Sequence, residues 1–284
     1  MRYDILEQIR RLDPEHDHQR IMHLSTCWDF PWDTTRALEL ALFRTFGVPG
    51  IASLLDQTGE FCQRTRKRYD DTDLIVSEMV EHGYDSERGR RALKRMNQIH
   101  GRFRISNPDY LYVLSTFILE PIRWNARFGW RPLCEQEKQA YYVFWREVGT
   151  RMGIRDIPSS LEAYDRFNRD YEAQHFRYTP ANQRVGSATR ELFVSWFPYL
   201  PRELTRLGIY ALMDEPLLRA FGFPSAPRLL RFMAVAALKL RALALRFFPP
   251  RRTARLRTGM VRPTYPQGYQ IEQLGPCQGT TSSP

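Results

Sequence analysis

The most informative stretch of the sequence is RMNQIHGRFRISNPDYLYVLSTFILEPIRWNARFGWR, residues 95–131. It places one histidine, His100, late in a helical pattern. A glycine follows the histidine directly, and its missing side chain would let a bulky planar group or another helix approach. Asn107 and Pro108 then supply a cap and a first-turn proline for a second helix, which Pro121 is expected to end. The sequence therefore predicts two closely linked helices with a single histidine on the first.

The rest of the chain repeats the helical pattern and shows almost no alternation typical of strands. Ser86 is expected to cap the helix that carries His100, and a capping box of Ser159 and Glu162 to open another. Further helices are expected at residues 34–46, 72–82, 134–152, 187–197, 201–213 and 227–248, and the capping box opens one at 159–175. We therefore expect an all-α fold, a single multi-helix domain over residues 1–250, with an irregular basic tail over residues 251–284.

Composition agrees with a folded, enzyme-sized chain. Its 284 residues are 43% hydrophobic and 13% aromatic, which excludes a disordered chain and allows a substantial core. The four cysteines, Cys27, Cys62, Cys134 and Cys277, show no Cys-x-x-Cys spacing, so neither a zinc site nor a disulfide framework is predicted. The first twenty residues mix charged and apolar side chains too closely for a secretory signal, and we expect an intracellular protein.

The positive charge is concentrated in one segment. Residues 228–262 hold ten basic and no acidic side chains, which accounts for the whole net charge of +10. Within this segment, residues 229–248 read as a helix with a broad apolar face and four cations, too many for a simple spanning helix. Two alternatives stay open: an interfacial helix on an anionic membrane surface, or a core helix with a solvated basic side. Nucleic-acid binding is not expected, because the cluster lacks a recognised motif.

Three patterns in the sequence suggest metal sites of other kinds. Asp70-Asp71-Thr72-Asp73 resembles the aspartate-rich magnesium motif of class I terpenoid synthases, but no second motif accompanies it, and Asp71 or Thr72 would equally cap a helix. A di-iron bundle needs Glu-x-x-His pairs, and the sequence has none. A third candidate is a histidine cluster in a polar amino-terminal stretch, where a solvated surface is the expected state: His16, His18 and His23.

The stretch around His100 also carries a family resemblance. The runs that carry it are Met96 to His100, Ile105 to Asn107 with Asp109, Leu111 to Leu114, Glu120 to Trp124, and Trp130-Arg131. Together these runs resemble the MpaB-type oxygenases, which share a haem-containing catalytic domain with the latex-clearing rubber oxygenases. The resemblance begins near Arg64 and continues more loosely through residues 149–158. It implies an all-α haem enzyme.

The resemblance implies roles for individual residues. It assigns His100 as the proximal ligand of haem b iron. Arg68 and Thr72 match a distal arginine and threonine of the rubber-cleaving members, and their spacing of four places them on one helix face. Those members have a lysine directly before the threonine, where this chain has Asp71, so a prenyl-like substrate is expected in place of rubber. For a catalytic base, the nearest carboxylates are Asp71 and Asp70.

Two arginines near the second helix have two possible roles. Arg123 and Arg131 could bind the haem propionates, because guanidinium groups bind carboxylates bidentately, or they could form structural ion pairs. The function expected is a haem b-dependent oxygenase that uses dioxygen on an unsaturated, prenyl-like or otherwise lipophilic chain, in the cytosol or at a membrane surface. The alternatives are a non-enzymatic helical protein that binds membranes or other partners, and a magnesium-dependent terpenoid synthase-like enzyme.

Overall fold

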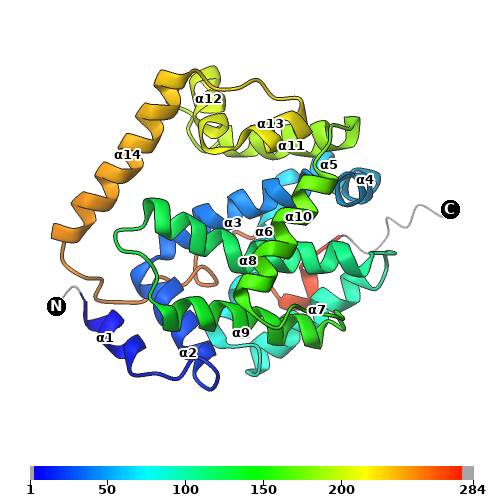
Figure 1. The fold of residues 1–284 in the computed structure, drawn as a ribbon. Coiled ribbons are helices and arrows are strands. Elements are labelled where there is room, and N and C mark those ends of the chain that lie inside the picture. Colours follow the sequence, from blue (N-terminus) through cyan, green and yellow to red (C-terminus); the bar gives the residue numbers. More distant parts are fainter. Residues whose placement is uncertain (1–2, 277–284) are drawn as a thin grey trace.

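The computed structural model describes residues 3–276, and within this range the chain forms helices and no strand, which confirms the all-α prediction (Figure 1). The α-helices are α1 (Asp4–Arg10), α2 (His18–His23), α3 (Pro31–Phe46), α4 (Pro49–Gln57), α5 (Glu60–Gln63), α6 (Thr65–His82), α7 (Glu87–His100), α8 (Asn107–Phe128), α9 (Glu135–Arg151), α10 (Leu161–His175), α11 (Pro180–Val194), α12 (Arg202–Leu212), α13 (Glu215–Phe221) and α14 (Arg228–Phe247). A π-helical turn, η1 (Leu24–Asp29), precedes α3, and a 3₁₀ turn, η2 (Ile271–Gln273), lies near the carboxyl end.

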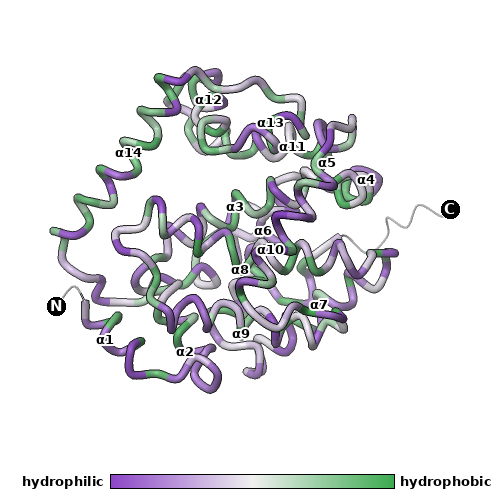
Figure 2. The backbone as a smooth tube through the Cα atoms, viewed as in Figure 1, coloured by the Kyte–Doolittle hydropathy of each residue, from purple (hydrophilic) through white to green (hydrophobic). Residues whose placement is uncertain are grey.

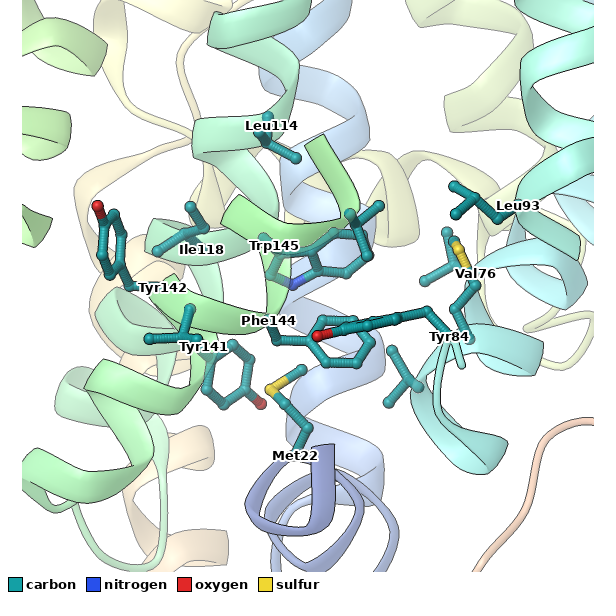
Figure 3. Packing of buried hydrophobic residues seen from close by; sticks show 14 of the residues in the cluster. Met22, Val76, Tyr84, Leu93, Leu114, Ile118, Tyr141, Tyr142, Phe144 and Trp145 are labelled. Carbon is teal, nitrogen blue, oxygen red and sulfur yellow. The ribbon is translucent and has the colours of Figure 1, made fainter. Parts of the chain in front are cut away.

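The largest core gathers around α8 and α9. Helix α8 packs along α3 and also contacts α9 and α10, while α6 packs against α7. Figure 3 shows aromatic side chains of α9, including Phe144 and Trp145, meeting Leu114 and Ile118 of α8 and Met22 of α2. These side chains are nearly all inaccessible to solvent, so the elements around His100 are held rigidly.

Helix α8 does not end at Pro121, as the sequence predicted, but continues to Phe128. An internal proline removes one backbone hydrogen bond and costs about 3 kcal/mol. The helix face beyond Pro121 carries Trp124 and Phe128, both at most 4% exposed, and their burial outweighs that cost. The cap also differs, because Ser106, one residue before the expected Asn107, accepts the hydrogen bond from the Asp109 amide at 3.2 Å.

Other helix boundaries shift as well. Helix α6 begins at Thr65, seven residues before the expected start, so that Arg68 and Thr72 share one helix. Helix α10 is capped by Ser160, whose hydroxyl accepts from the Ala163 amide at 3.2 Å, and not by the predicted capping box one residue earlier. Several helices of nine residues or fewer were not predicted, because such short segments show little periodicity: α1, α2, α4, α5 and α13.

The carboxy-terminal segment, residues 249–276, is irregular in backbone, as expected, but it is docked against α6 and α7. Arg95 of α7 donates to the carbonyl of Leu274 at 2.7 Å, and Arg257 forms an ion pair with Asp73 of α6 at 2.7 Å. Ile271 and Leu274 are buried in the main core. Residues 251–276 therefore belong to the same folded unit as the helices. The remaining tail, with Cys277, lies outside the described residues.

Helix α14 runs along the outer edge of the molecule (Figure 1), where it contacts α12 and α8. Its only buried residue is Ala242. Figure 2 shows hydrophobic and hydrophilic residues mixed along its length, and several large apolar side chains face solvent, among them Phe232 at 70% and Leu240 at 65% exposure. Helix α14 is therefore not a core helix. Over residues 3–276, no single helix is long and apolar enough to cross a membrane; only α3 and α4 taken together meet those limits, with a bend of 94° between them.

Candidate active site

His100 lies at the last position of α7 and lines a cavity of about 260 Å³. The walls come from seven helices, α3 to α9, and most of the lining side chains are apolar. They include Leu42 of α3, Leu54 of α4, Ile99 of α7, Val113 and Phe117 of α8, and Trp145 of α9. The cavity also contains three of the residues that the sequence singled out, Arg68, Asp71 and Thr72, all on α6. One apolar space thus joins the histidine to the polar face of a second helix.

His100 is in the state that a metal requires of an imidazole. Burial and, less strongly, the charge of Arg68 together lower its pKa to about 4, so the ring is neutral near pH 7. Its Nδ1 atom is buried and has no hydrogen-bond partner among the described residues. The ring meets Tyr110 edge to face, with centroids 5.6 Å apart. A neutral imidazole with an unpartnered buried nitrogen, in a largely apolar cavity, fits a haem ligand.

Arg68 and Thr72 face the cavity as a hydrogen-bonded pair. The guanidinium Nη1 donates to the Thr72 hydroxyl, and the hydroxyl donates to the Arg68 carbonyl at 3.0 Å. The guanidinium also lies over the Phe61 ring, 5.2 Å from its centroid. Burial lowers the Arg68 pKa, while the nearby acids Asp71 and Glu60 raise it. Because no carboxylate forms an ion pair with Arg68 within residues 3–276, its remaining N–H groups are available to a ligand.

Asp71 lines the same cavity, but its carboxylate is already engaged. It accepts a hydrogen bond from Lys67, one turn earlier, at 2.7 Å and another from the hydroxyl of Tyr265. Lys67 also donates to the carbonyl of Gly275 at 2.9 Å. Asp71 thereby ties α6 to the docked carboxy-terminal segment, and its role as a catalytic base remains a prediction.

Two cavity residues were missed from the sequence. Glu60 lines the cavity, and its carboxylate accepts a hydrogen bond from Arg64 at 3.0 Å. In the sequence, only its position at the start of a helix after Gly59 could have drawn attention to it. Arg104 lines the cavity and is exposed, so it stands where the cavity opens to solvent. Its position four residues after His100, in an irregular turn, was the only signal in the sequence.

Arg123 and Arg131 do not line this cavity. Arg123 contacts Glu120 at 2.8 Å and Asp165 at 2.7 Å. Arg131 lies between Asp29 and Glu137, with a contact of 2.6 Å to each. Of the two roles expected for these arginines, the structure shows the structural ion pairs and places neither next to His100.

The other candidate metal groups are engaged within the protein. Asp70 accepts from Thr264 at 2.6 Å, and Asp73 accepts from Arg257 and Arg262. The three amino-terminal histidines also bond separately, to Asp13, Tyr84 and the Glu81 carbonyl: His16, His18 and His23. No group of three or more His, Cys, Asp or Glu side chains within residues 3–276 is placed to hold a metal ion. The aspartate-rich motif therefore serves to bind cations of the carboxy-terminal segment.

Comparison with known proteins gives consistent matches. Residues 35–244 match the family model described as ER-bound oxygenase mpaB/B'/Rubber oxygenase, catalytic domain. The ER-bound oxygenase mpaB' of Penicillium brevicompactum is 31% identical over 250 residues, which cover 80% of this chain and 58% of that protein. The ER-bound oxygenase mpaB of Penicillium roqueforti is 32% identical over 213 residues, 68% of this chain and 70% of that protein. The mpaB protein of P. brevicompactum is 32% identical over 185 residues, 59% of this chain and 47% of its own length.

Proposed function

This chain belongs to the family of mpaB-type oxygenases and rubber oxygenases, and from that premise we propose that it is a haem b-dependent oxygenase that acts with dioxygen on an unsaturated lipophilic chain. The observation that carries the proposal is His100, a neutral histidine with an unpartnered buried nitrogen in an apolar cavity. When bound, haem supplies iron for redox chemistry with dioxygen. The residues of the chain hold the group and surround it.

Each polar residue of the cavity has a distinct task in this proposal. His100 offers a nitrogen to the iron, since its low pKa removes competition from protons. Arg68 and Thr72 present hydrogen-bond donors from α6, prearranged by their contact with each other, and such donors stabilise negative charge that develops during a reaction. Arg104, at the exposed side of the cavity, takes the role first expected of Arg123 and Arg131, because its guanidinium suits the carboxylates of haem.

The cavity walls support a lipophilic substrate. Apart from the residues on α6, Glu60, Arg104 and a few others, the lining consists of aliphatic and aromatic side chains. Apolar walls also exclude water from the reacting centre, which strengthens the electrostatic effect of Arg68.

Helix α14 supports a second partner, an anionic membrane surface. Its exposed apolar side chains recur at intervals of three and four along one stripe: Leu229, Phe232, Met233, Leu240, Leu243 and Phe247. The cations divide into two groups. Arg231 and Arg241 are ion-paired with Glu215 and Asp33 of the protein, whereas Arg228 and Lys239 are exposed. A lipophilic substrate would be reached at such a surface.

The visible absorption spectrum tests the haem proposal. The purified chain, supplied with haem, should show a Soret band at stoichiometric occupancy. His100→Ala should lose that band, because it removes the protein ligand to iron, and should keep its helical circular dichroism. His175→Ala is the matched control, since this histidine on α10 does not line the cavity and should leave haem binding intact. A full Soret band in His100→Ala, or none in the parent protein, would refute the proposal.

A further inference from the structure

A second, smaller chamber adjoins the His100 cavity. Its volume is about 70 Å³, room for a few water-sized groups. The two spaces share five wall residues from α3, α6, α8 and α9: Leu42, Thr72, Val76, Phe117 and Trp145. Thr72 is the one polar residue of this shared wall, and it also binds Arg68 in the larger cavity. A chain that occupied both spaces would pass Thr72.

The chamber contains a buried carboxyl group, Glu39 of α3. Both of its hydrogen bonds go to one oxygen, Oε1, from Arg36 at 2.6 Å and from the hydroxyl of Tyr69 at 2.9 Å. The other oxygen, Oε2, is left for a ligand. Burial raises the Glu39 pKa to about 7, against the opposing charge of Arg36 and, less strongly, of Arg257. The carboxyl group is therefore able to donate as well as accept near neutral pH.

Two hydroxyl groups in the chamber lack hydrogen-bond partners among the described residues. The hydroxyl of Tyr141, a fully buried residue of α9, is one, and that of Thr34 on α3 is the other. Burial raises the Tyr141 pKa, and the nearby hydroxyl groups of Thr34 and Ser25 partly oppose this rise. Neither of these two hydroxyl groups forms a hydrogen bond of normal geometry with the Tyr141 hydroxyl. Figure 3 shows the Tyr141 hydroxyl directed toward Met22, another chamber residue. A buried hydroxyl without a partner costs about 1–3 kcal/mol, which a ligand could recover.

We propose that this chamber binds the hydroxyl-bearing end of an apolar chain, with Tyr141, Thr34 and Glu39 as its hydrogen-bonding partners. The remaining surface is apolar, formed by residues such as Met22, Leu38 and Val80, and suits the carbons next to that end. The inference rests on the proposed lipophilic substrate of the His100 cavity and deepens it: the substrate class becomes a long-chain alcohol, held by its polar end with the chain running past Thr72.

The charges around the chamber favour a neutral end group. A cationic end would meet Arg36 and Arg257, whose charges already act on Glu39. An anionic end would meet the Glu39 carboxylate and, beyond it, Asp73. A hydroxyl group avoids both repulsions and both donates and accepts, as the mixed donors and acceptors of the chamber require.

Calorimetric titration of the full chain with two probes of equal length tests the proposal. Octan-1-ol carries the hydroxyl group, and 1-fluorooctane replaces it with an atom that cannot donate. We expect the parent protein to bind octan-1-ol several-fold more tightly. Tyr141→Phe should reduce that preference by about 2- to 10-fold, as the loss of one hydrogen bond predicts, and Thr34→Val should act in the same direction.

The neighbouring tyrosine of α9 provides the matched control. The Tyr142 hydroxyl donates to the Pro158 carbonyl at 2.8 Å, and the residue does not line the chamber. Tyr142→Phe should therefore leave the preference for octan-1-ol unchanged. No preference in the parent protein, no binding of either probe, or a preference that survives in both Tyr141→Phe and Thr34→Val would overturn the proposal. Titrations with and without added haem separate this result from a failure of haem binding.

Discussion

At the scale of single residues, burial decides what each polar side chain in the cavities can do. The His100 ring is neutral because its surroundings disfavour the charged form, as the proposed role of iron ligand requires. Arg68 remains a donor because its hydrogen bond goes to Thr72, a neutral hydroxyl, and not to a carboxylate. Asp71, which lies between Arg68 and Thr72 on α6, instead forms an ion pair with Lys67. Neighbours on one helix thus differ in chemistry according to the groups that face them.

Arg68→Ala should keep haem but weaken the binding of anions at the iron. A charge-assisted hydrogen bond contributes about 1.5–3 kcal/mol, so fluoride affinity of the ferric protein should fall about tenfold or more. Turnover on an authentic substrate should fall on the order of a hundredfold. Arg66→Ala, on the same helix but outside the cavity, is the control and should bind fluoride like the parent. Spectrophotometric titration measures the affinity, and an unchanged fluoride affinity in Arg68→Ala would remove its assigned role.

Glu39 should make the stability of the protein depend on pH. Its pKa rises from 4.5 in the unfolded chain to about 7 in the fold, so the folded state binds more protons between these values. The free energy of unfolding should therefore fall as the pH rises from about 4.5 to about 7 and then level off, by about 3 kcal/mol at most from this group. Glu39→Gln should lose this part of the dependence. Urea unfolding across that pH range measures it, and parallel profiles for the two proteins would contradict the assignment.

At the scale of elements, α8 and α14 have similar apolar patterns, but α8 buries its apolar side chains and α14 exposes most of them. Helix α8 continues through Pro121 because Trp124 and Phe128 are buried beyond it. Helix α14 has an equally apolar pattern, yet most of its large side chains face solvent. This exposed apolar stripe and the exposed cations beside it are the features on which the proposed binding to an anionic membrane surface depends.

Substitutions on α14 should weaken membrane binding and leave the fold intact. Phe232→Ser combined with Leu240→Ser removes two exposed apolar side chains, and exposed substitutions usually change stability by about 0.5 kcal/mol or less. Sedimentation with anionic vesicles should show reduced binding, and the binding of the parent should weaken with salt, because screening acts within roughly 8 Å. Val261→Ser, an exposed apolar residue outside α14, is the control. Equal binding to neutral and anionic vesicles would show that no such surface exists.

At the scale of the whole molecule, the carboxy-terminal segment completes both cavities. Arg255 and Arg257 line the inner chamber, while Gly275 and Pro276 line the His100 cavity. The segment also supplies the cations that neutralise the acidic face of α6, so that the aspartates of that face are satisfied within the protein. The carboxy-terminal segment and the helices that line the two cavities thus form one folded unit.

Truncation after residue 250 should destabilise the entire domain. It removes the partners of Asp70 and Asp73, and leaving buried charges without partners costs about 3–5 kcal/mol. It also exposes the core surface that Ile271 and Leu274 cover. Thermal unfolding should occur at a lower temperature, and limited proteolysis should cut α6 and α7 faster than in the full chain. An unchanged unfolding temperature would show that the segment is a dispensable tail.

Features that depend on local geometry could be predicted from the amino-acid sequence alone. Helical periodicity predicted the all-α fold, and a spacing of four residues predicted that Arg68 and Thr72 share a face, because the pitch of a helix fixes that relation. The family resemblance of the run around His100 made this residue the candidate ligand, and that role remains a prediction; the structure places His100 in a largely apolar cavity. These inferences need no knowledge of which distant segments meet.

Features that depend on contacts between distant segments could not be predicted in this way, because the tertiary fold sets them. Arg123 and Arg131 form ion pairs with distant acidic residues, whereas Arg104 lines the His100 cavity. Helix α8 continues through Pro121 because the residues beyond it are buried. The inner chamber around Glu39 and the docking of residues 249–276 have the same origin. Burial and ion pairing depend on which side chains surround a group in space, and a linear pattern does not specify those neighbours.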